Sequence, residues 1–309
     1  MSAALIVLAL LPLAGALLAA LARGRLAVAG AAAVLATTFV LAAWLLLETS
    51  AGGTTVVSRS WAPALDLTLA LRFDRLSGAT ALLIALAGLG GLWRLTKSAA
   101  REPVAGSDSA LLVLFAGLTQ ALVLTENLLV LVAFAELGAL VAFALERGRG
   151  AGEGPARAAL YVRSGSALLL LAAALVLADT AGSFEFGSVF AAGASIRAHA
   201  LYPLLLALVL AAAWSRAAAW PWIRWPRGAD LGDDAAAGVT GACLLATGVY
   251  LAIRLSPLVV GALPRAVVAI GFVALPLLVA VLGRAARALG AREEAPASRT
   301  PAAVARARE

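Results

Sequence analysis

The feature that most constrains this chain is a succession of apolar segments of about 20 residues, separated by short polar stretches. A helix needs about 20 apolar residues to cross the hydrocarbon core of a bilayer. Because lipid offers the backbone no hydrogen-bond partner, such segments are expected to be helical. The apolar windows lie near residues 3–22, 27–48, 76–95, 109–125, 127–145, 158–178, 200–219, 235–254 and 263–283.

These windows predict an all-α fold, a polytopic membrane helix bundle of about nine transmembrane helices. With 63% hydrophobic and 13% charged residues, the chain is unlike a soluble globular domain. Residues 1–290 are expected to form one transmembrane domain, and residues 291–309, which lack an apolar face, a disordered tail. The alternating, β-branched texture of residues 51–75 favours a short hairpin that caps the outer face.

The basic residues indicate orientation. A net charge of +7 would suggest a nucleic-acid partner for a soluble protein, but in a membrane protein arginines and lysines mark the cytoplasmic loops. Their distribution predicts an outer N-terminus, a cytoplasmic C-terminus, contact with lipid and no nucleic-acid partner. Because Arg23 and Arg25 follow the first apolar run and no basic residues precede it, this run is expected to be a retained helix.

The stretch 214–228 interrupts the apolar pattern with arginines, four tryptophans and two prolines. A helix that enters it must break or kink at or before Pro221, and Pro226 follows shortly after. Interrupted helices beside buried charges are typical of ion or substrate paths in transporters. The alternative is a helix that ends at the membrane interface, where tryptophans form an aromatic belt and arginines act as anchors.

Charged residues also fall inside the apolar windows. Glu136 lies near the middle of one, so its carboxyl group must be neutral, paired or facing water. We therefore expect either a functional acid or a protonated glutamate hydrogen-bonded to a neighbouring helix. Arg163 is near the cytoplasmic end of its window and either extends to the interface or pairs with Glu136, whereas Arg216 lies deeper and is the better buried partner.

Other site chemistries find no support in the sequence. The single cysteine, Cys243, and the single histidine, His199, form no metal-ligand set. There is no phosphate-binding glycine loop and no nucleophile, base and acid triad. We therefore expect no metal, no cofactor and no catalytic residues.

Several short motifs, in this order and spacing, resemble the antiporter-like subunits, which are the proton-translocating subunits of complex I (NADH:quinone oxidoreductase, chain L type) and their Mrp sodium/proton antiporter relatives. The same module is similar to the membrane subunit of some inorganic-carbon uptake systems. The motifs are Phe73 to Ser77, Thr125 to Leu129 running on to Glu136 and Leu137, Arg163 to Gly165, the break from Pro221 to Pro226, and Ala246 to Leu251.

The resemblance implies two inverted five-helix repeats, each with a broken helix, and a protonation relay that starts at a glutamate and lysine pair. Glu136 matches the glutamate, Arg163 an assisting basic residue, and Arg216 the lysine ahead of the break. Ser166 stands at the position of an acid and Thr240 at that of a histidine. Arginine stays charged, and serine and threonine store no proton near neutral pH, so these positions have lost proton-carrying groups.

The resemblance therefore implies a truncated, degenerate antiporter-like subunit of a proton- or cation-translocating complex in a bacterial-type inner membrane, ending where the second repeat begins. It would be at most a non-redox membrane subunit of an NADH:quinone oxidoreductase-like translocase, with other membrane subunits as partners. The alternative is a non-conducting scaffold, or a membrane anchor for a soluble partner such as an inorganic-carbon uptake protein.

Overall fold

The computed structural model describes residues 1–49, 53–62, 67–98, 106–148, 153–217 and 235–259. These ranges contain ten helices and two strands. In chain order they are α1 (Ser2–Leu21), α2 (Arg25–Glu48), β1 (Thr55–Ala62), β2 (Leu67–Phe73), α3 (Arg75–Ser98), α4 (Gly106–Leu124), α5 (Leu128–Gly148), α6 (Glu153–Ala181), α7 (Phe186–Ala191), α8 (Gly193–Ala198), α9 (Tyr202–Arg216) and α10 (Ala235–Val259).

Seven of these helices, α1 to α6 and α10, are long and apolar enough to cross a membrane. The expectation of an all-α membrane bundle is therefore confirmed, but the count of about nine spans is not. The window near 200–219 forms the shorter helix α9, of 15 residues, which ends at Arg216. The window near 263–283, Pro221, Pro226 and the tail 291–309 lie outside the described residues.

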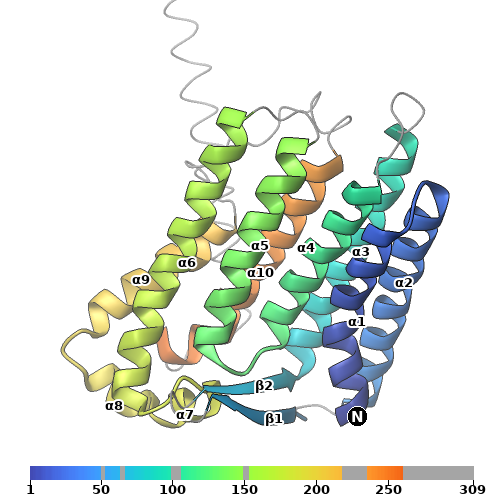
Figure 1. Ribbon diagram of the computed structural model, residues 1–309. Helices are drawn as coiled ribbons and strands as arrows, with labels where there is room; N and C mark the ends of the chain where they lie inside the picture. The colour runs from blue at the N-terminus through green and yellow to red at the C-terminus, as the bar shows by residue number, and fades with distance from the viewer. Residues whose placement is uncertain (50–52, 63–66, 99–105, 149–152, 218–234, 260–309) are drawn as a thin grey trace, which may run out of the picture.

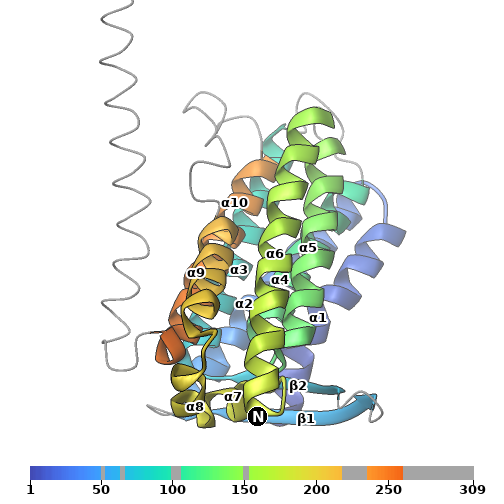
Figure 2. The ribbon, with the colours of Figure 1, turned by 90° about the vertical axis from the view of Figure 1, so that its left-hand side faces the viewer.

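The long helices run side by side and alternate in direction (Figures 1 and 2). Helix α10 returns to pack against α3 and α9 and also touches α4 and α5. Helix α4 is the most enclosed of the seven, with 78% of its apolar window buried. It packs against α1, α3 and α5 and also contacts α2 and α10, so α4 lies at the centre of these five spans.

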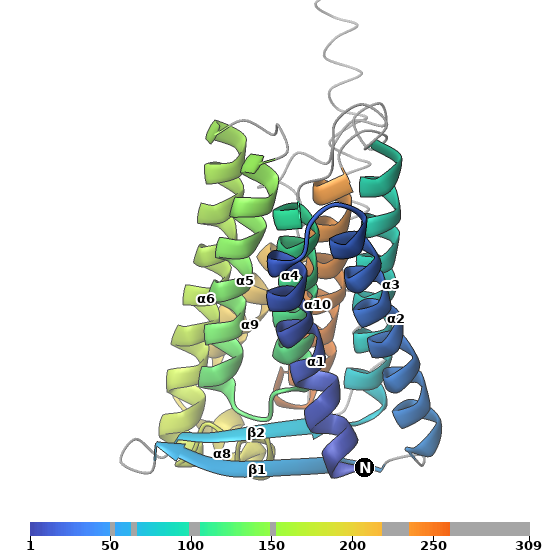
Figure 3. The same cartoon turned by 45° about the vertical axis from the view of Figure 1, so that its right-hand side comes forward.

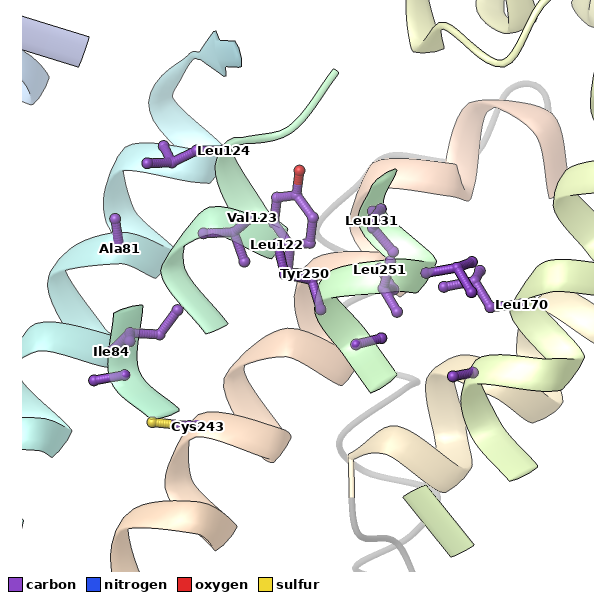
Figure 4. Packing of buried hydrophobic residues seen from close by; sticks show 14 of the residues in the cluster. Ala81, Ile84, Leu122, Val123, Leu124, Leu131, Leu170, Cys243, Tyr250 and Leu251 are labelled. Carbon is purple, nitrogen blue, oxygen red and sulfur yellow. The ribbon is translucent and has the colours of Figure 1, made fainter. Parts of the chain in front are cut away.

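The interior is filled by aliphatic side chains from distant parts of the sequence (Figure 4). Tyr250 and Leu251 of α10 lie among Leu122 of α4, Leu131 of α5 and Leu170 of α6, all of them almost completely buried. The return of α10 therefore closes the core between the two halves of the bundle.

Helices α1 and α4 are joined by a contact that a proline makes necessary. Pro12 has no N–H, so the carbonyl of Leu8 lacks its partner within the helix. The Gln120 side-chain Nε2 donates to this Leu8 oxygen at 2.8 Å. At Gly117, a Cβ atom would lie 2.9 Å from the Pro12 Cβ, so the two helices meet more closely than a larger residue allows.

One end of the bundle is covered by the predicted hairpin, which is confirmed (Figure 3). Strands β1 and β2 pair antiparallel, with Thr55 opposite Phe73. The turn between α4 and α5 continues this pairing, because the Glu126 N–H donates to the Ala70 carbonyl of β2 at 2.8 Å. Helices α7 and α8, which the sequence did not predict, lie at the same end.

Asp74, between β2 and α3, anchors α10 to the hairpin. Arg254 of α10 donates to both of its carboxylate oxygens and also to the Tyr250 hydroxyl. Burial alone would raise the pKa of the Asp74 carboxyl, but the hydrogen bonds and charge of Arg254, together with hydrogen bonds from Ser77, hold this pKa well below its usual range.

A second arginine extends the network towards α7. Both carboxylate oxygens of Glu126 accept hydrogen bonds from Arg72 Nη1, each at 2.8 Å. The same carboxylate accepts the backbone N–H of Gly187 at 2.9 Å, in the first turn of α7. Hairpin, interhelical turn and short helix are thus held by charged hydrogen bonds.

We predict that Asp74→Asn destabilises the protein near neutral pH and that this difference shrinks in acid. Because the folded-state pKa of Asp74 is depressed, its stabilisation is complete above the ordinary value of 3.8 and is lost as the pH falls further. The melting temperatures of both proteins in detergent, measured from pH 7 to pH 3, test this. A difference that stays constant over the range would contradict the proposed role of the carboxylate.

Candidate functional site

The centre of the candidate site is a buried ion pair between α5 and α6. Arg163 donates from Nη1 to Glu146 Oε2 at 3.0 Å and from Nη2 to Oε1 at 2.5 Å. The Thr240 hydroxyl of α10 donates to the same Oε1 at 2.7 Å. Glu146 and Arg163 are only 6% and 5% exposed, so the pair is shielded from solvent and the three helices meet at one carboxylate.

A two-point contact of this kind suits a buried arginine, because it pairs the charge and satisfies two of the guanidinium donors. Removing one partner from such a pair leaves an uncompensated charge, which is strongly destabilising. The fork of the guanidinium matches the two carboxylate oxygens, and this geometry offsets part of the desolvation cost.

Glu136 lies ten residues before Glu146 on α5, which corresponds to about 15 Å along a helix. Its side chain is half-buried, and its Oε2 accepts a hydrogen bond from the Ser164 hydroxyl of α6 at 2.9 Å. The start of α5 sets this register, because Asn127 Oδ1 caps the helix by accepting the N–H groups of Leu129 and Val130.

Arg216, the last residue of α9, is 4% exposed. It lies within electrostatic range of both Arg163 and Glu136. Its Nε is buried and makes no hydrogen bond with any described residue. Ser166 joins α6 to the same helix, since its hydroxyl donates to the Ala212 carbonyl at 2.9 Å.

The predicted residues thus lie in one region of the structure, but their ion-pair partners differ from those expected from the sequence. Arg163 pairs with Glu146 and not with Glu136. Between the described residues Glu136 and Arg216 there is electrostatic influence but no ion-pair contact. The roles of all five predicted residues in transport remain predictions.

Glu146 is the residue that the sequence reasoning missed. It stands at the end of its apolar window, next to the exposed Arg147, where a charged side chain usually reaches the interface. The one signal in the sequence was that Arg163 lies at the same end of the next, antiparallel helix.

The described site offers two acids and two arginines, so the charges balance when both acids are ionised. A carboxyl group can take up and release a proton, whereas a guanidinium keeps its charge. Any proton exchange among these four side chains is therefore confined to Glu136 and Glu146. Among the described residues, no group of His, Cys, Asp or Glu is placed to hold a metal ion.

Comparison with known proteins relates the chain to cation antiporters. It is 31% identical over 237 residues to a probable K⁺/H⁺ antiporter protein, the A/B subunit, of Rhizobium meliloti, matching 75% of this chain and 24% of that protein. It is 26% identical over 220 residues to the A1 subunit of a Na⁺/H⁺ antiporter of Staphylococcus haemolyticus, matching 69% of this chain and 27% of that protein. The chain thus spans about a quarter of the length of these relatives. No protein-family model matches it.

Solved structures share the fold. A chain of the Mrp complex from Dietzia sp. superposes with a TM-score of 0.69 at 25% identity, covering 84% of this chain and 28% of that one. A chain of respiratory complex I from Thermus thermophilus gives a TM-score of 0.62 at 22% identity, covering 83% of this chain and 53% of that one.

Fold and site together define a multi-pass helical membrane protein with ionisable side chains inside its bundle. By sequence the chain is related to antiporter-like subunits of the Mrp type. It shares its fold with a chain of respiratory complex I.

We predict that Glu146→Gln and Arg163→Gln each destabilise the protein by about 3–5 kcal/mol, because each leaves one buried charge unpaired. The double variant should be destabilised less than either single variant. Unfolding of the purified chain in mixed detergent micelles measures this. Glu153→Gln serves as the control, since its ion pair with Arg157 is more than half exposed. Additive single effects would show that the pair is not energetically coupled.

Proposed function

We propose that the chain is an antiporter-like membrane subunit of a complex that moves protons or other cations across a bacterial-type inner membrane. The observation that carries the proposal is Glu136, a half-buried acid in the middle of a membrane-spanning helix. An ionisable residue at this depth is costly and usually functional. The relatives with similar sequences are K⁺/H⁺ and Na⁺/H⁺ antiporter subunits by name, which supports a cation as the transported species.

Glu136 is the proton-exchanging group in this proposal. The Ser164 hydroxyl donates a hydrogen bond to its carboxylate, and Arg216 lies within electrostatic range of it. Proton uptake by Glu136 would remove the negative charge that Arg216 experiences. A cation that approaches Arg216 would then meet a changed electric field at the end of α9.

A second candidate, a degenerate subunit that serves as a non-conducting scaffold, is favoured by a specific observation. Apart from the two acids, the polar groups of the site cannot store a proton and pass it onward in the way that lysine and histidine can. Arg163 and Arg216 stay charged, and Ser166 and Thr240 are engaged in hydrogen bonds that join helices. In a scaffold the buried charges would only fix how the helices pack.

Transport separates the two candidates. We predict that Glu136→Gln abolishes cation-driven proton movement in inverted membrane vesicles, measured with a pH-sensitive dye after addition of Na⁺ or K⁺. Expression and thermal stability should stay close to those of the wild type, because glutamine keeps an acceptor for Ser164. Glu153→Gln, which alters an exposed acid, should transport normally. Undiminished transport by Glu136→Gln would favour the scaffold.

We also propose that other membrane subunits complete the complex, with the C-terminus of this chain in the cytoplasm. The similar solved structures are multi-subunit membrane complexes, which supports such partners. Mild-detergent purification from native membranes, followed by mass spectrometry, should recover antiporter or oxidoreductase membrane subunits. Recovery with a soluble inorganic-carbon uptake protein, and without membrane subunits, would instead support the anchor function.

A further inference from the structure

Adjacent residues of α6 contact the two acids of α5. Arg163 is held by Glu146, and Ser164 donates to Glu136. Helix α6 therefore presents a cation to one acid and a neutral hydroxyl to the other. The Arg163 Nε is buried and makes no hydrogen bond with described residues, so this guanidinium retains a free donor beside its pair.

We propose that Glu146 is a positioning residue for Glu136, because it holds the Arg163 guanidinium away from that acid and leaves Arg216 as the cation that Glu136 experiences. The inference rests on the proposed function, in which Glu136 exchanges protons. It adds to that function a residue, Glu146, that sets the pH at which Glu136 exchanges its proton.

The surroundings of the two acids are distinct. Of the charged and titratable side chains on the described neighbouring helices, Arg163 of α6 contacts Glu146, where the Thr240 hydroxyl of α10 also binds. Glu136 accepts a hydrogen bond from Ser164 of α6. The charged side chain of α9 that interacts electrostatically with Glu136 is Arg216.

Loss of the Glu146 charge would redirect Arg163. Because arginine stays protonated, its buried guanidinium would need another anion. The other acid on α5 is Glu136, which already contacts the residue that follows Arg163 on α6. A guanidinium placed beside Glu136 would favour its ionised form.

The test is the pH profile of cation-driven proton transport by the full chain in native membrane vesicles. In Glu146→Gln the midpoint should move to lower pH by about 1 unit or more, as expected for a carboxyl group that gains a cationic neighbour. In Glu146→Gln/Arg163→Gln the midpoint should return to the wild-type value, since the redirected cation is gone. Glu153→Gln should keep the wild-type profile. A lower rate with an unchanged midpoint in Glu146→Gln would show a structural role only and overturn the proposal.

A spectroscopic titration separates this inference from the proposed function. The infrared band of the protonated Glu136 carboxyl group, identified by its loss in Glu136→Gln, can be titrated in the purified chain in lipid. Should the wild type show no transport, the proposed function fails. A band midpoint that shifts downward in Glu146→Gln would still support the positioning role, and an unshifted midpoint would refute it.

The conservative variant Glu146→Asp covers the case in which Glu146→Gln does not fold. Its carboxylate is withdrawn by one methylene, so it cannot reach Arg163 and Thr240 as Glu146 does. The midpoint should move in the same direction by a smaller amount, and an unmoved midpoint in folded Glu146→Asp would overturn the proposal.

Discussion

A buried charge is costly unless it is paired, and the contact between Glu146 and Arg163 supplies that pairing between α5 and α6. Thr240 brings α10 to the same carboxylate, and Ser166 ties α6 to α9 through a backbone carbonyl. Because lipid tails are as apolar as the helices, no hydrophobic force selects helix partners in a bilayer, and polar contacts such as these add to van der Waals packing in specifying which helices are neighbours.

Helix α10 is fixed at two levels by different chemistry. Near its start Thr240 binds a buried carboxylate, and near its end Arg254 binds Asp74 at the hairpin. These two residues are fourteen positions apart, about 21 Å along a helix. The polar residues of α10 therefore link the intramembrane charges to the network that holds β2, Glu126 and α7.

The parts of this structure that the sequence predicted are those set by local rules. The length of the apolar windows predicted the long helices, because the thickness of the bilayer sets how many residues a span needs. The alternation of β-branched residues predicted the hairpin. Glu136 stood out as a lone acid in an apolar run. The burial of Glu146 could not be predicted, since it depends on Arg163 and Thr240 from other helices, and Asp74 meets Arg254 across 180 residues of sequence. Short helices such as α7 carry too few residues to show a period.

The proline in α1 bears on how the protein is made. The Leu8 carbonyl that Pro12 leaves open is filled by Gln120, which lies 112 residues later in the chain. During synthesis α1 therefore enters the membrane with an unmet hydrogen-bond acceptor, long before its donor exists. Until α4 is inserted, water, the insertion machinery or another polar group must donate a hydrogen bond to the Leu8 carbonyl. Once α4 packs against α1, Gln120 takes over that hydrogen bond.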